Sequence, residues 1–181
     1  MVTDTPLLPG MKLISLRAFD DERGFFMESY NHRVFRETYG ISETFVQDNH
    51  SKSKQNVLRG LHYQIQDPQG KLVRVLTGSV YDVAVDLRKS SPSFGQWAGI
   101  TLHTADKQVL WIPPGFAHGF LVLSAEADFL YKTSGYYNPR GERCLLWNDP
   151  NVGIVWPLTG QPLMSPKDLK GTHLKEADLF P

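Results

Sequence analysis

The sequence predicts an all-β protein, a sandwich or barrel with a few short peripheral helices. Short runs of apolar, β-branched and aromatic residues recur along the chain, and glycine, proline and asparagine interrupt them where turns are needed. Only two stretches have the features of a helix. The length of 181 residues is typical of one domain, so we expect a single domain over residues 1–181, ending in an irregular C-terminal segment.

Ten runs are expected to be strands, because each is rich in strand-forming residues and most end at a turn. Gly78 separates two of them, Gly95 precedes the seventh, 113–115 (Pro-Pro-Gly) precedes the ninth, and 138–141 (Asn-Pro-Arg-Gly) ends the tenth. In chain order the expected strands are 11–16, 24–30, 45–49, 57–65, 71–76, 79–87, 96–103, 108–112, 116–123 and 127–137.

One helix is expected between the second and third strands. Asn31 can cap its first turn, Val34, Phe35 and Tyr39 give a partial apolar face, and Gly40 can end it. A second, short helix can begin near 165–166 (Ser-Pro), since proline suits an early helical position. The C-terminal segment is expected to wrap the surface irregularly, because it carries Pro150, Pro157, Pro162 and Pro166.

Composition excludes several classes of protein. Nineteen Lys and Arg residues balance nineteen Asp and Glu residues, and this zero net charge argues against a general nucleic-acid or anionic-membrane binder. The single cysteine, Cys144, excludes an intrachain disulfide and a cysteine-based zinc site. Because the first ten residues lack signal-peptide features and no run approaches the roughly 18 apolar residues of a membrane span, we expect a cytoplasmic protein.

The strand expected at 79–87 alternates strictly. Val80, Asp82, Ala84 and Asp86 share one face, because successive strand side chains point to opposite sides. Two carboxylates on such a face have two explanations. The face is either exposed to solvent, as is common in antiparallel sheets, or part of a polar interior that holds a ligand.

Residues 59–64 (Arg-Gly-Leu-His-Tyr-Gln) combine two chemically informative side chains in one expected strand. His62 can move a proton near neutral pH, and the planar guanidinium of Arg59 suits phosphate or carboxylate. Strict alternation places the two on opposite faces. A bulge at Gly60 would bring both inward; without one they cannot serve the same pocket.

A tight turn at 113–115 delivers His118 at the start of a strand. With the strand pattern, this Pro-x-Gly-x-x-His spacing resembles the second motif of the cupin superfamily. The first cupin motif normally supplies His-x-His and a carboxylate to a metal, but the matching place here reads His62-Tyr63-Gln64. With one imidazole in place of two, a bound metal is not expected.

Three further blocks carry groups that can bind or react. Residues 19–28 combine a turn, Arg23, an aromatic pair and Glu28, and 47–49 (Gln-Asp-Asn) ends a strand with three hydrogen-bonding side chains. Lys71 opens a strand, where a partly buried ammonium can stabilise an oxyanion. Tyr131, Tyr136 and Tyr137 lie close in sequence. Each block also has an ordinary structural explanation: a solvated turn, an exposed lysine, or tyrosine packing.

Taken together, the motifs are specific. FDDERGFFMES, FVQDNHSKS, LRGLHYQ, GKLVRVLTGSVYDVAVDLR, PPGFAHGF and YKTSGYY occur in this order and cover nearly the whole chain. They resemble the dTDP-4-dehydrorhamnose 3,5-epimerase family. The resemblance implies a cupin-type jelly-roll, a homodimer that exchanges strands, and catalysis without metal or cofactor. It also implies conversion of dTDP-4-dehydro-6-deoxy-D-glucose to dTDP-4-dehydro-L-rhamnose for cell-envelope polysaccharides.

The resemblance also implies roles for individual residues. His62 is the expected base, Tyr131 the acid on the opposite face of the sugar, Lys71 the cation at the C4 oxygen, and Asp168 the group that orients the base. Asp82 is expected, from its inward face, to pair with Lys71 or His118. The expected substrate-binding residues are Arg23, Glu28, Gln47, Asp48, Asn49, Arg59, Lys71, His118, Tyr137, Glu142 and Lys167.

Three alternatives remain open from the sequence. A mono-epimerase would invert only C3 or C5 of a related dTDP-keto sugar. A sugar- or nucleotide-binding cupin without catalysis would not need His62, Lys71 and Tyr131 together. A metal-dependent cupin oxygenase or isomerase is disfavoured by Gln64 at the second ligand position.

Overall fold

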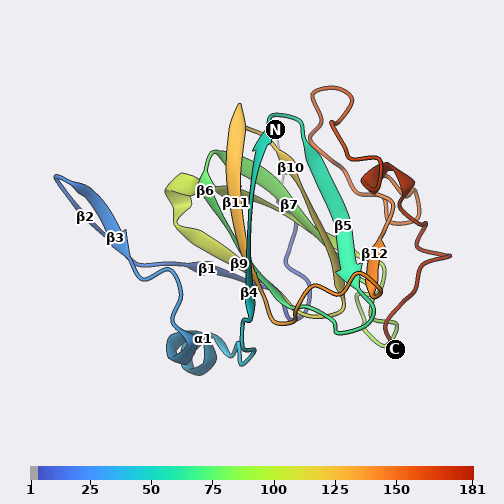
Figure 1. Cartoon of the computed structure of the whole chain (residues 1–181), viewed down its shortest axis with the longest axis horizontal. Coiled ribbons are helices and arrows are strands. Elements are labelled where there is room, and N and C mark those ends of the chain that lie inside the picture. The colour runs from blue at the N-terminus through green and yellow to red at the C-terminus, as the bar shows by residue number, and fades with distance from the viewer. Residues whose placement is uncertain (1–3) are drawn as a thin grey trace.

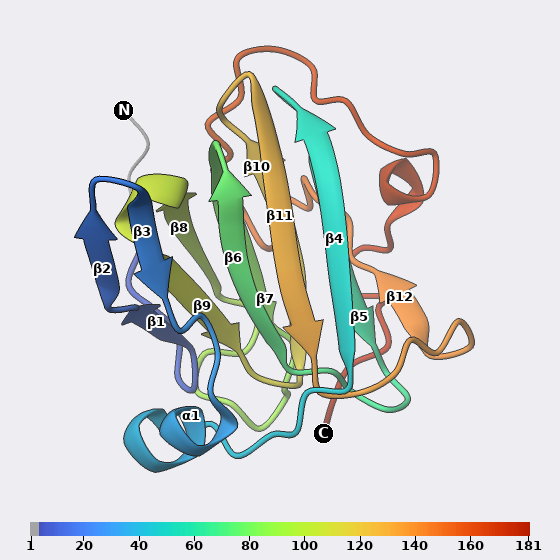
Figure 2. The same cartoon turned by 60° about the vertical axis from the view of Figure 1, so that its left-hand side comes forward.

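The computed structural model describes residues 4–181. Residues 1–3 lie outside the described residues. They belong to the domain expected over 1–181 and to the first ten residues, in which no signal-peptide features were found. Two five-stranded antiparallel sheets face each other as a β-sandwich (Figures 1 and 2). The predicted all-β, cupin-type architecture is therefore confirmed. Within residues 4–181, no helix is both long and apolar enough to cross a membrane.

The first sheet has the order β1-β9-β6-β11-β4 and the second has the order β12-β5-β10-β7-β8. The first contains β1 (Lys12–Ser15), β4 (Gln47–Lys54), β6 (Lys71–Thr77), β9 (Gln108–Ile112) and β11 (Glu126–Thr133). The second contains β5 (Leu58–Gln64), β7 (Ser79–Asp86), β8 (Trp97–His103), β10 (Phe116–Val122) and β12 (Glu142–Cys144). Neighbours in the sheets are often far apart in sequence, as in a jelly roll.

Three apolar clusters hold the sandwich together. The largest fills the space between the sheets, with Val73, Ala84 and Phe129 among its fully buried members. A second covers the outer face of the β5–β10–β7 sheet, where the C-terminal segment packs its apolar side chains. A third lies under the helix on the outer face of the other sheet. Each sheet is thus buried on its inner face and over much of its outer face.

The predicted helix is confirmed as α1 (His32–Tyr39). The Asn31 side chain accepts from the backbone N–H groups of Arg33 and Val34, and Gly40 ends the helix at φ 64°, a conformation that glycine adopts without strain. Phe35 of this helix is buried against the first sheet. Elsewhere, the 3₁₀ turn η1 (Thr104–Asp106) connects β8 to β9. The second expected helix is only a 3₁₀ turn, η2 (Asp168–Lys170), within an otherwise irregular C-terminal segment.

Several predicted strand ends were wrong. β4 continues to Lys54, beyond the expected end at 49, because eight register pairs with β11 support a polar sequence that has little strand propensity of its own. β11 ends at Thr133, four residues early, because Ser134 begins a loop. β3 (Gly24–Met27) ends three residues before the predicted 30, where the chain turns toward α1. β2 (Ala18–Asp21) and β12 were not predicted.

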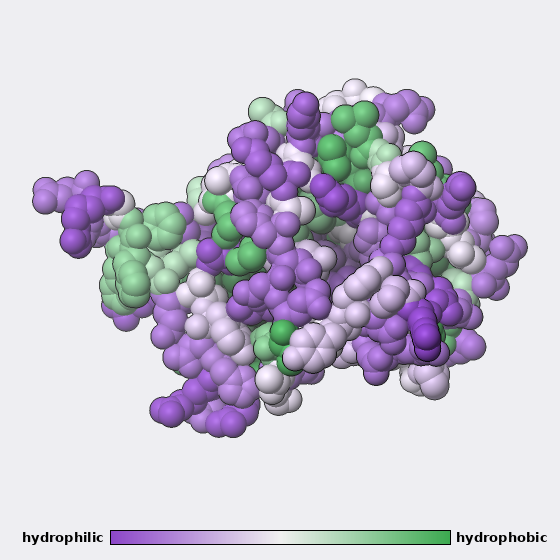
Figure 3. Space-filling model, in the orientation of Figure 1, coloured by the Kyte–Doolittle hydropathy of each residue, from purple (hydrophilic) through white to green (hydrophobic). Residues whose placement is uncertain are grey.

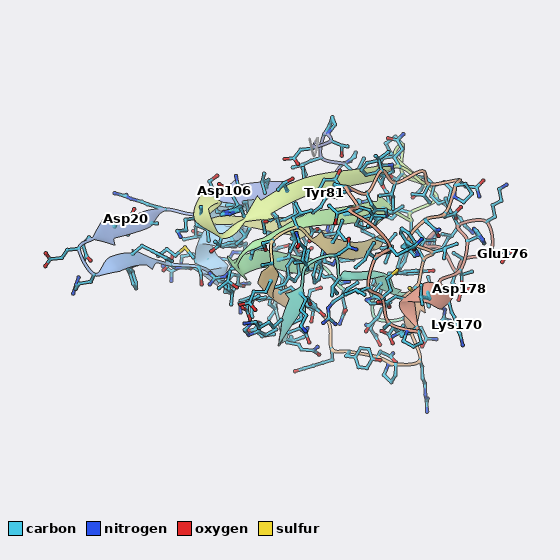
Figure 4. All side chains as sticks on the ribbon, turned by 90° about the horizontal axis from the view of Figure 1, so that it is seen from above. Asp20, Tyr81, Asp106, Lys170, Glu176 and Asp178 are labelled. Carbon is cyan, nitrogen blue, oxygen red and sulfur yellow. The ribbon has the colours of Figure 1, made fainter. Side chains whose placement is uncertain are left out.

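A hairpin of β2 and β3 projects from the body of the molecule as a separate two-stranded sheet (Figures 1 and 4). Phe25 and Phe26 are 52% and 72% exposed on it. Figure 3 shows a hydrophobic area on this arm, between its hydrophilic tip and the body. We refer to residues 18–27 as the arm.

Candidate active site

A cavity of about 550 Å³ opens between the two sheets. Strands β4, β6 and β11 supply one wall, β5 and β10 supply the other, and the C-terminal segment reaches its rim. Eleven of the predicted site residues line it: Gln47, Asn49, Arg59, His62, Lys71, His118, Tyr131, Tyr137, Glu142, Lys167 and Asp168.

A bulge in β5 brings Arg59 and His62 to the same cavity. His62 lies opposite His118, but Arg59 lies opposite Phe120, so three residue steps on β5 match two on β10. Gly60 sits inside this step at φ 118°, where a Cβ atom would lie 2.6 Å from Cα of Gly119. Only glycine fits there, because both the conformation and the close backbone approach exclude a side chain.

His62 forms a hydrogen-bonded dyad with Asp168. Nε2 of the imidazole lies 2.6 Å from Oδ1 of Asp168, which η2 carries to the cavity wall and which is 3% exposed. The Asp168 backbone N–H donates to Oγ of Ser165 at 3.1 Å and so fixes the turn. Burial alone would raise the pKa of Asp168, but the hydrogen bond from His62 holds it below its usual value. The ionised carboxylate can therefore orient the ring.

Cys144 lies beside this dyad, and its Sγ, His62 and Asp168 place three potential metal ligands within 4.8 Å of one another. Two ligands of one tetrahedral zinc ion would be about 3.3 Å apart, so the 2.6 Å His62–Asp168 separation fits a shared proton better than a shared ion. Burial raises the pKa of the Cys144 thiol to about 12, which disfavours the thiolate that a metal requires. His62 and Asp168 therefore form a hydrogen-bonded pair, and the neutral thiol of Cys144 lies next to it.

Lys71 is buried in the cavity wall at 7% exposure, and its Nζ donates to the backbone carbonyl of His62 at 3.0 Å. Burial lowers the pKa of Lys71 to about 8, although Asp82 and Glu142 favour the charged form. The ammonium is therefore protonated at neutral pH and scarcely hydrated, the state in which a cation best stabilises an oxyanion.

Asp82 and His118 form a second buried pair in the same wall. Nε2 of His118 lies 2.9 Å from Oδ2 of Asp82, and the two side chains are 5% and 1% exposed. The explanation that this face of the strand is exposed to solvent was therefore wrong, because the other sheet covers it. Burial lowers the pKa of His118 despite the neighbouring carboxylate, so its imidazole is neutral and donates to Asp82.

Tyr131 projects into the cavity from β11, which belongs to the sheet opposite that of His62. Burial raises the pKa of its phenol, and the nearby Arg59 only partly offsets this effect. The hydroxyl is therefore protonated at neutral pH. A hydrogen-bond acceptor and donor, His62 and Tyr131, thus reach one cavity from its two opposing walls.

At the rim, three side chains form a chain of polar contacts. Tyr137 donates its hydroxyl to Oε2 of Glu142 at 2.7 Å, and Glu142 forms an ion pair with Lys167. Burial would raise the pKa of Glu142, but these two contacts lower it below its usual value. Arg59, Lys167 and Lys71 give the cavity three cationic groups, which suit an anionic ligand such as a diphosphate.

Three predicted site residues do not line this cavity. Arg23 pairs with Asp21 at the tip of the arm, and Glu28 accepts a hydrogen bond from Asn31 at the base of the arm. Asp48 points to the outer face of its sheet, where it pairs with Lys132 at 2.8 Å. The alternation of β4 explains this: Gln47 and Asn49 face inward, so the residue between them faces outward.

Comparison with known proteins decides the family. The sequence model of the dTDP-4-dehydrorhamnose 3,5-epimerase family matches residues 5–176. The Pseudomonas aeruginosa enzyme of that name is 56% identical over 174 residues, which are 96% of each chain. The chain belongs to this family. It is accordingly an enzyme, an epimerase of the isomerase class.

Solved structures of family members agree with the fold. The Legionella pneumophila dTDP-6-deoxy-D-glucose-3,5-epimerase, solved with dTDP-4-keto-L-rhamnose, has a TM-score of 0.90 and 52% identity, covering 93% of this chain and 89% of that one. A Streptomyces bikiniensis 3'-monoepimerase, ChmJ, solved with dTDP-quinovose, has a TM-score of 0.87 at 31% identity, covering 94% and 87%.

Sequence reasoning missed several residues that line the cavity of this family member. Ser51 continues the inward alternation of β4, a signal that was present but lost when the strand was ended at 49. Phe120 and Phe129 stack with ring centroids 4.2 Å apart at the floor. Gln69 and Ser165 lie in loops, whose placement no sequence periodicity predicts.

Proposed function

We propose that the chain inverts C3 and C5 of dTDP-4-dehydro-6-deoxy-D-glucose and so forms dTDP-4-dehydro-L-rhamnose, the keto sugar of dTDP-L-rhamnose biosynthesis. The observation that carries the proposal is a base–acid pair, His62 and Tyr131, on opposing walls of one cavity. Family membership and relatives solved with dTDP-sugars support the substrate class.

The chemistry follows from the 4-keto group. Protons on C3 and C5 lie α to the carbonyl, so a base can remove one and leave an enolate. In the proposal His62 takes this proton while Asp168 holds the ring in place, and Tyr131 returns a proton to the opposite face of the carbon. A positioned acid or base contributes typically about 10²–10⁴-fold. Because the phenol is protonated at neutral pH, it is ready to donate.

Lys71 stabilises the enolate in this proposal. Negative charge builds on the C4 oxygen when the α proton leaves, and a preorganised buried cation stabilises it more than water would. Its hydrogen bond to the His62 carbonyl holds the ammonium next to the strand that carries the base. In the same wall, the hydrogen bond between His118 and Asp82 fixes a neutral imidazole whose remaining ring nitrogen, Nδ1, is an acceptor.

Two cationic side chains of the cavity, Arg59 and Lys167, bind the diphosphate in this proposal. Arg59 donates from Nε to Ser53 at 3.0 Å, which leaves the terminal nitrogens of its guanidinium for phosphate oxygens. Lys167 adds a second cation, and the ring of Tyr137 offers a flat surface to the thymine base. Gln47 and Asn49 bind the nucleoside or the sugar from β4.

We propose further that the active enzyme is a homodimer in which the arm of each subunit completes the partner's cavity. Arg23 and Glu28, predicted to bind substrate, lie on or beside the arm and outside their own cavity. The exposed Phe25 and Phe26 give the arm an apolar surface that a second copy can cover (Figure 3).

A mixing experiment tests the dimer. His62→Ala removes the base and Arg23→Glu reverses the charge at the arm, so each variant alone is expected to be inactive. In a mixed dimer, one site would combine an intact cavity with an intact arm, and random mixing restores about a quarter of the wild-type sites. No recovery after mixing would mean that the arm does not serve a partner.

Deuterium incorporation tests the reaction itself. With the wild-type enzyme and the dTDP-4-keto sugar in deuterated water, NMR should find deuterium at both C3 and C5 of the product. Label at one carbon only would favour a mono-epimerase. The 31% identity to the 3'-monoepimerase ChmJ keeps that second candidate open. Absence of label from both carbons would refute both forms of the proposal.

A further inference from the structure

The loop at 134–141 carries a rim residue, Tyr137, on a segment whose side chains are largely open to solvent. Tyr136 and Tyr137 are 70% and 54% exposed. An exposed aromatic ring on a loop would ordinarily sample several positions, and binding would then have to order it. The backbone of this loop is instead tied to the sandwich at consecutive residues.

Gln64 makes two of these backbone hydrogen bonds, on either side of Tyr137. It is the last residue of β5 and is 4% exposed. Its Nε2 donates to the backbone carbonyls of Asp67 at 3.0 Å and Tyr136 at 3.2 Å, and its Oε1 accepts from the Asn138 N–H at 2.8 Å. One N–H of the side-chain amide bonds the loop and the other bonds Asp67, so Gln64 has no donor left for a ligand.

Gln47 holds the residue between these two points from the opposite sheet. Its Oε1 accepts from the Tyr137 N–H at 3.0 Å, while its Nε2 donates to Asn49 at 2.9 Å. The far end of the ring is fixed as well, because the Tyr137 hydroxyl donates to Glu142 at 2.7 Å. The ring is therefore held at its backbone and at its hydroxyl while its body stays exposed.

We propose that Gln64 is a positioning residue that presets the Tyr137 ring as a platform for the planar base of a nucleoside diphosphate sugar. This inference rests on the proposed function and deepens it. A ring fixed before binding loses little conformational entropy when a base stacks on it, so the preset loop raises affinity without touching the reacting carbons. Gln64 stands where a cupin metal site would have its second histidine, and its amide serves the loop instead of a metal.

The test uses Gln64→Met, which keeps the length of the side chain and removes all three hydrogen bonds. The dissociation constant for dTDP, measured by titration calorimetry, should rise about tenfold, and KM for the keto sugar should rise with it while kcat changes less than about twofold. Amide hydrogen exchange at Tyr137 and Asn138 should accelerate. The matched control is Gln55→Met, which removes a glutamine bond to the backbone of Leu123 at 2.9 Å, remote from the cavity, and should change none of these values.

A double-variant cycle separates positioning from direct contact. In a Tyr137→Ala background, Gln64→Met should weaken dTDP binding by less than about twofold, because the platform that it positions is already gone. Gln64→Glu places a buried carboxylate oxygen against the carbonyls of Asp67 and Tyr136, so its dTDP affinity should fall at least as far as that of Gln64→Met. Gln64→Leu, which also removes all three hydrogen bonds, replaces the methionine variant if that protein does not fold.

Three results would overturn the inference: unchanged dTDP affinity in Gln64→Met, a fall in kcat without a rise in KM, or an undiminished loss of affinity in the Tyr137→Ala background. Failure of the proposed function looks different. A wild-type protein that binds dTDP but does not epimerise the keto sugar would refute the reaction, and the affinity measurements would still decide the role of Gln64.

Discussion

Replacing the buried Lys71 by methionine should remove activity and at the same time stabilise the protein at neutral pH. Burial lowers the pKa of Lys71 from 10.5 to about 8, a shift of about 2.5 pH units. At about 1.4 kcal/mol per unit, keeping this ammonium charged costs the folded state about 3 kcal/mol. The variant also loses the hydrogen bond to the His62 carbonyl, which destabilises it by about 1 kcal/mol. The net effect is that Lys71→Met should be more stable than wild type at pH 7 by about 2 kcal/mol.

The pH dependence has a definite sign. Below pH 8 both the folded and the unfolded protein carry the Lys71 proton, so the cost is constant. Between about 8 and 10.5 the unfolded chain binds more protons, and the unfolding free energy of wild type rises by up to about 1.4 kcal/mol per pH unit relative to the variant. The advantage of Lys71→Met should therefore shrink as pH rises through this window.

Urea unfolding of both proteins from pH 6.5 to 9.5, at one protein concentration, measures this difference. Lys175→Met, at an exposed lysine, is the matched control and should track wild type. In turnover assays, wild-type kcat/KM should fall above about pH 8 as the cation is lost, and Lys71→Met should lose about 10²–10³-fold. A stability difference that does not change with pH would refute a lowered Lys71 pKa, and near-normal turnover would remove it from the oxyanion site.

Other predictions concern the bulge, the dyad, the acid and metal. Gly60→Ala should lower stability by more than 2 kcal/mol in urea unfolding and weaken turnover, because its Cβ would meet the Gly119 backbone at 2.6 Å; a variant as stable as wild type would contradict that geometry. Asp168→Asn should lower kcat about 10²-fold or more, with KM less affected, and a changed KM alone would indicate a binding role. Tyr131→Phe should still exchange α protons with deuterated water but lose most inverted product, since the base remains and the acid is gone; full inversion would exclude the phenol. Activity should survive exhaustive EDTA treatment, and a loss that added metal reverses would overturn the expectation of metal-free catalysis.

Much of the fold could be predicted because its local signals are strong. The helix ends were fixed by Asn31 and Gly40, two residues whose capping geometry is independent of the rest of the chain. The alternation of 79–87 correctly grouped Asp82 with inward residues. The predicted end of β4 at residue 49 was wrong. The polar stretch after it becomes a strand only through pairing with β11, which lies more than seventy residues away in the sequence.

The candidate site divides in the same way. Residue types and their order predicted a base, an acid, a buried cation and phosphate-binding groups, and eleven of the named side chains meet in one cavity. Sequence could not show that Asp48 faces away from it, since the phase of a strand is set by which face the opposite sheet covers. Nor could it show that Gln64, noted only as a missing metal ligand, ties down the loop that carries Tyr137.

By itself the sequence determined the all-β class, the positions of most turns and the chemical groups available for catalysis, because these follow from residue type and short-range spacing. Only the tertiary structure decided that Asp168 meets His62 across 106 residues, that a bulge turns Arg59 toward the same cavity, and that Lys71 loses its water. Such features arise when distant segments pack together, since contact, desolvation and register depend on which surfaces cover one another and not on any local pattern.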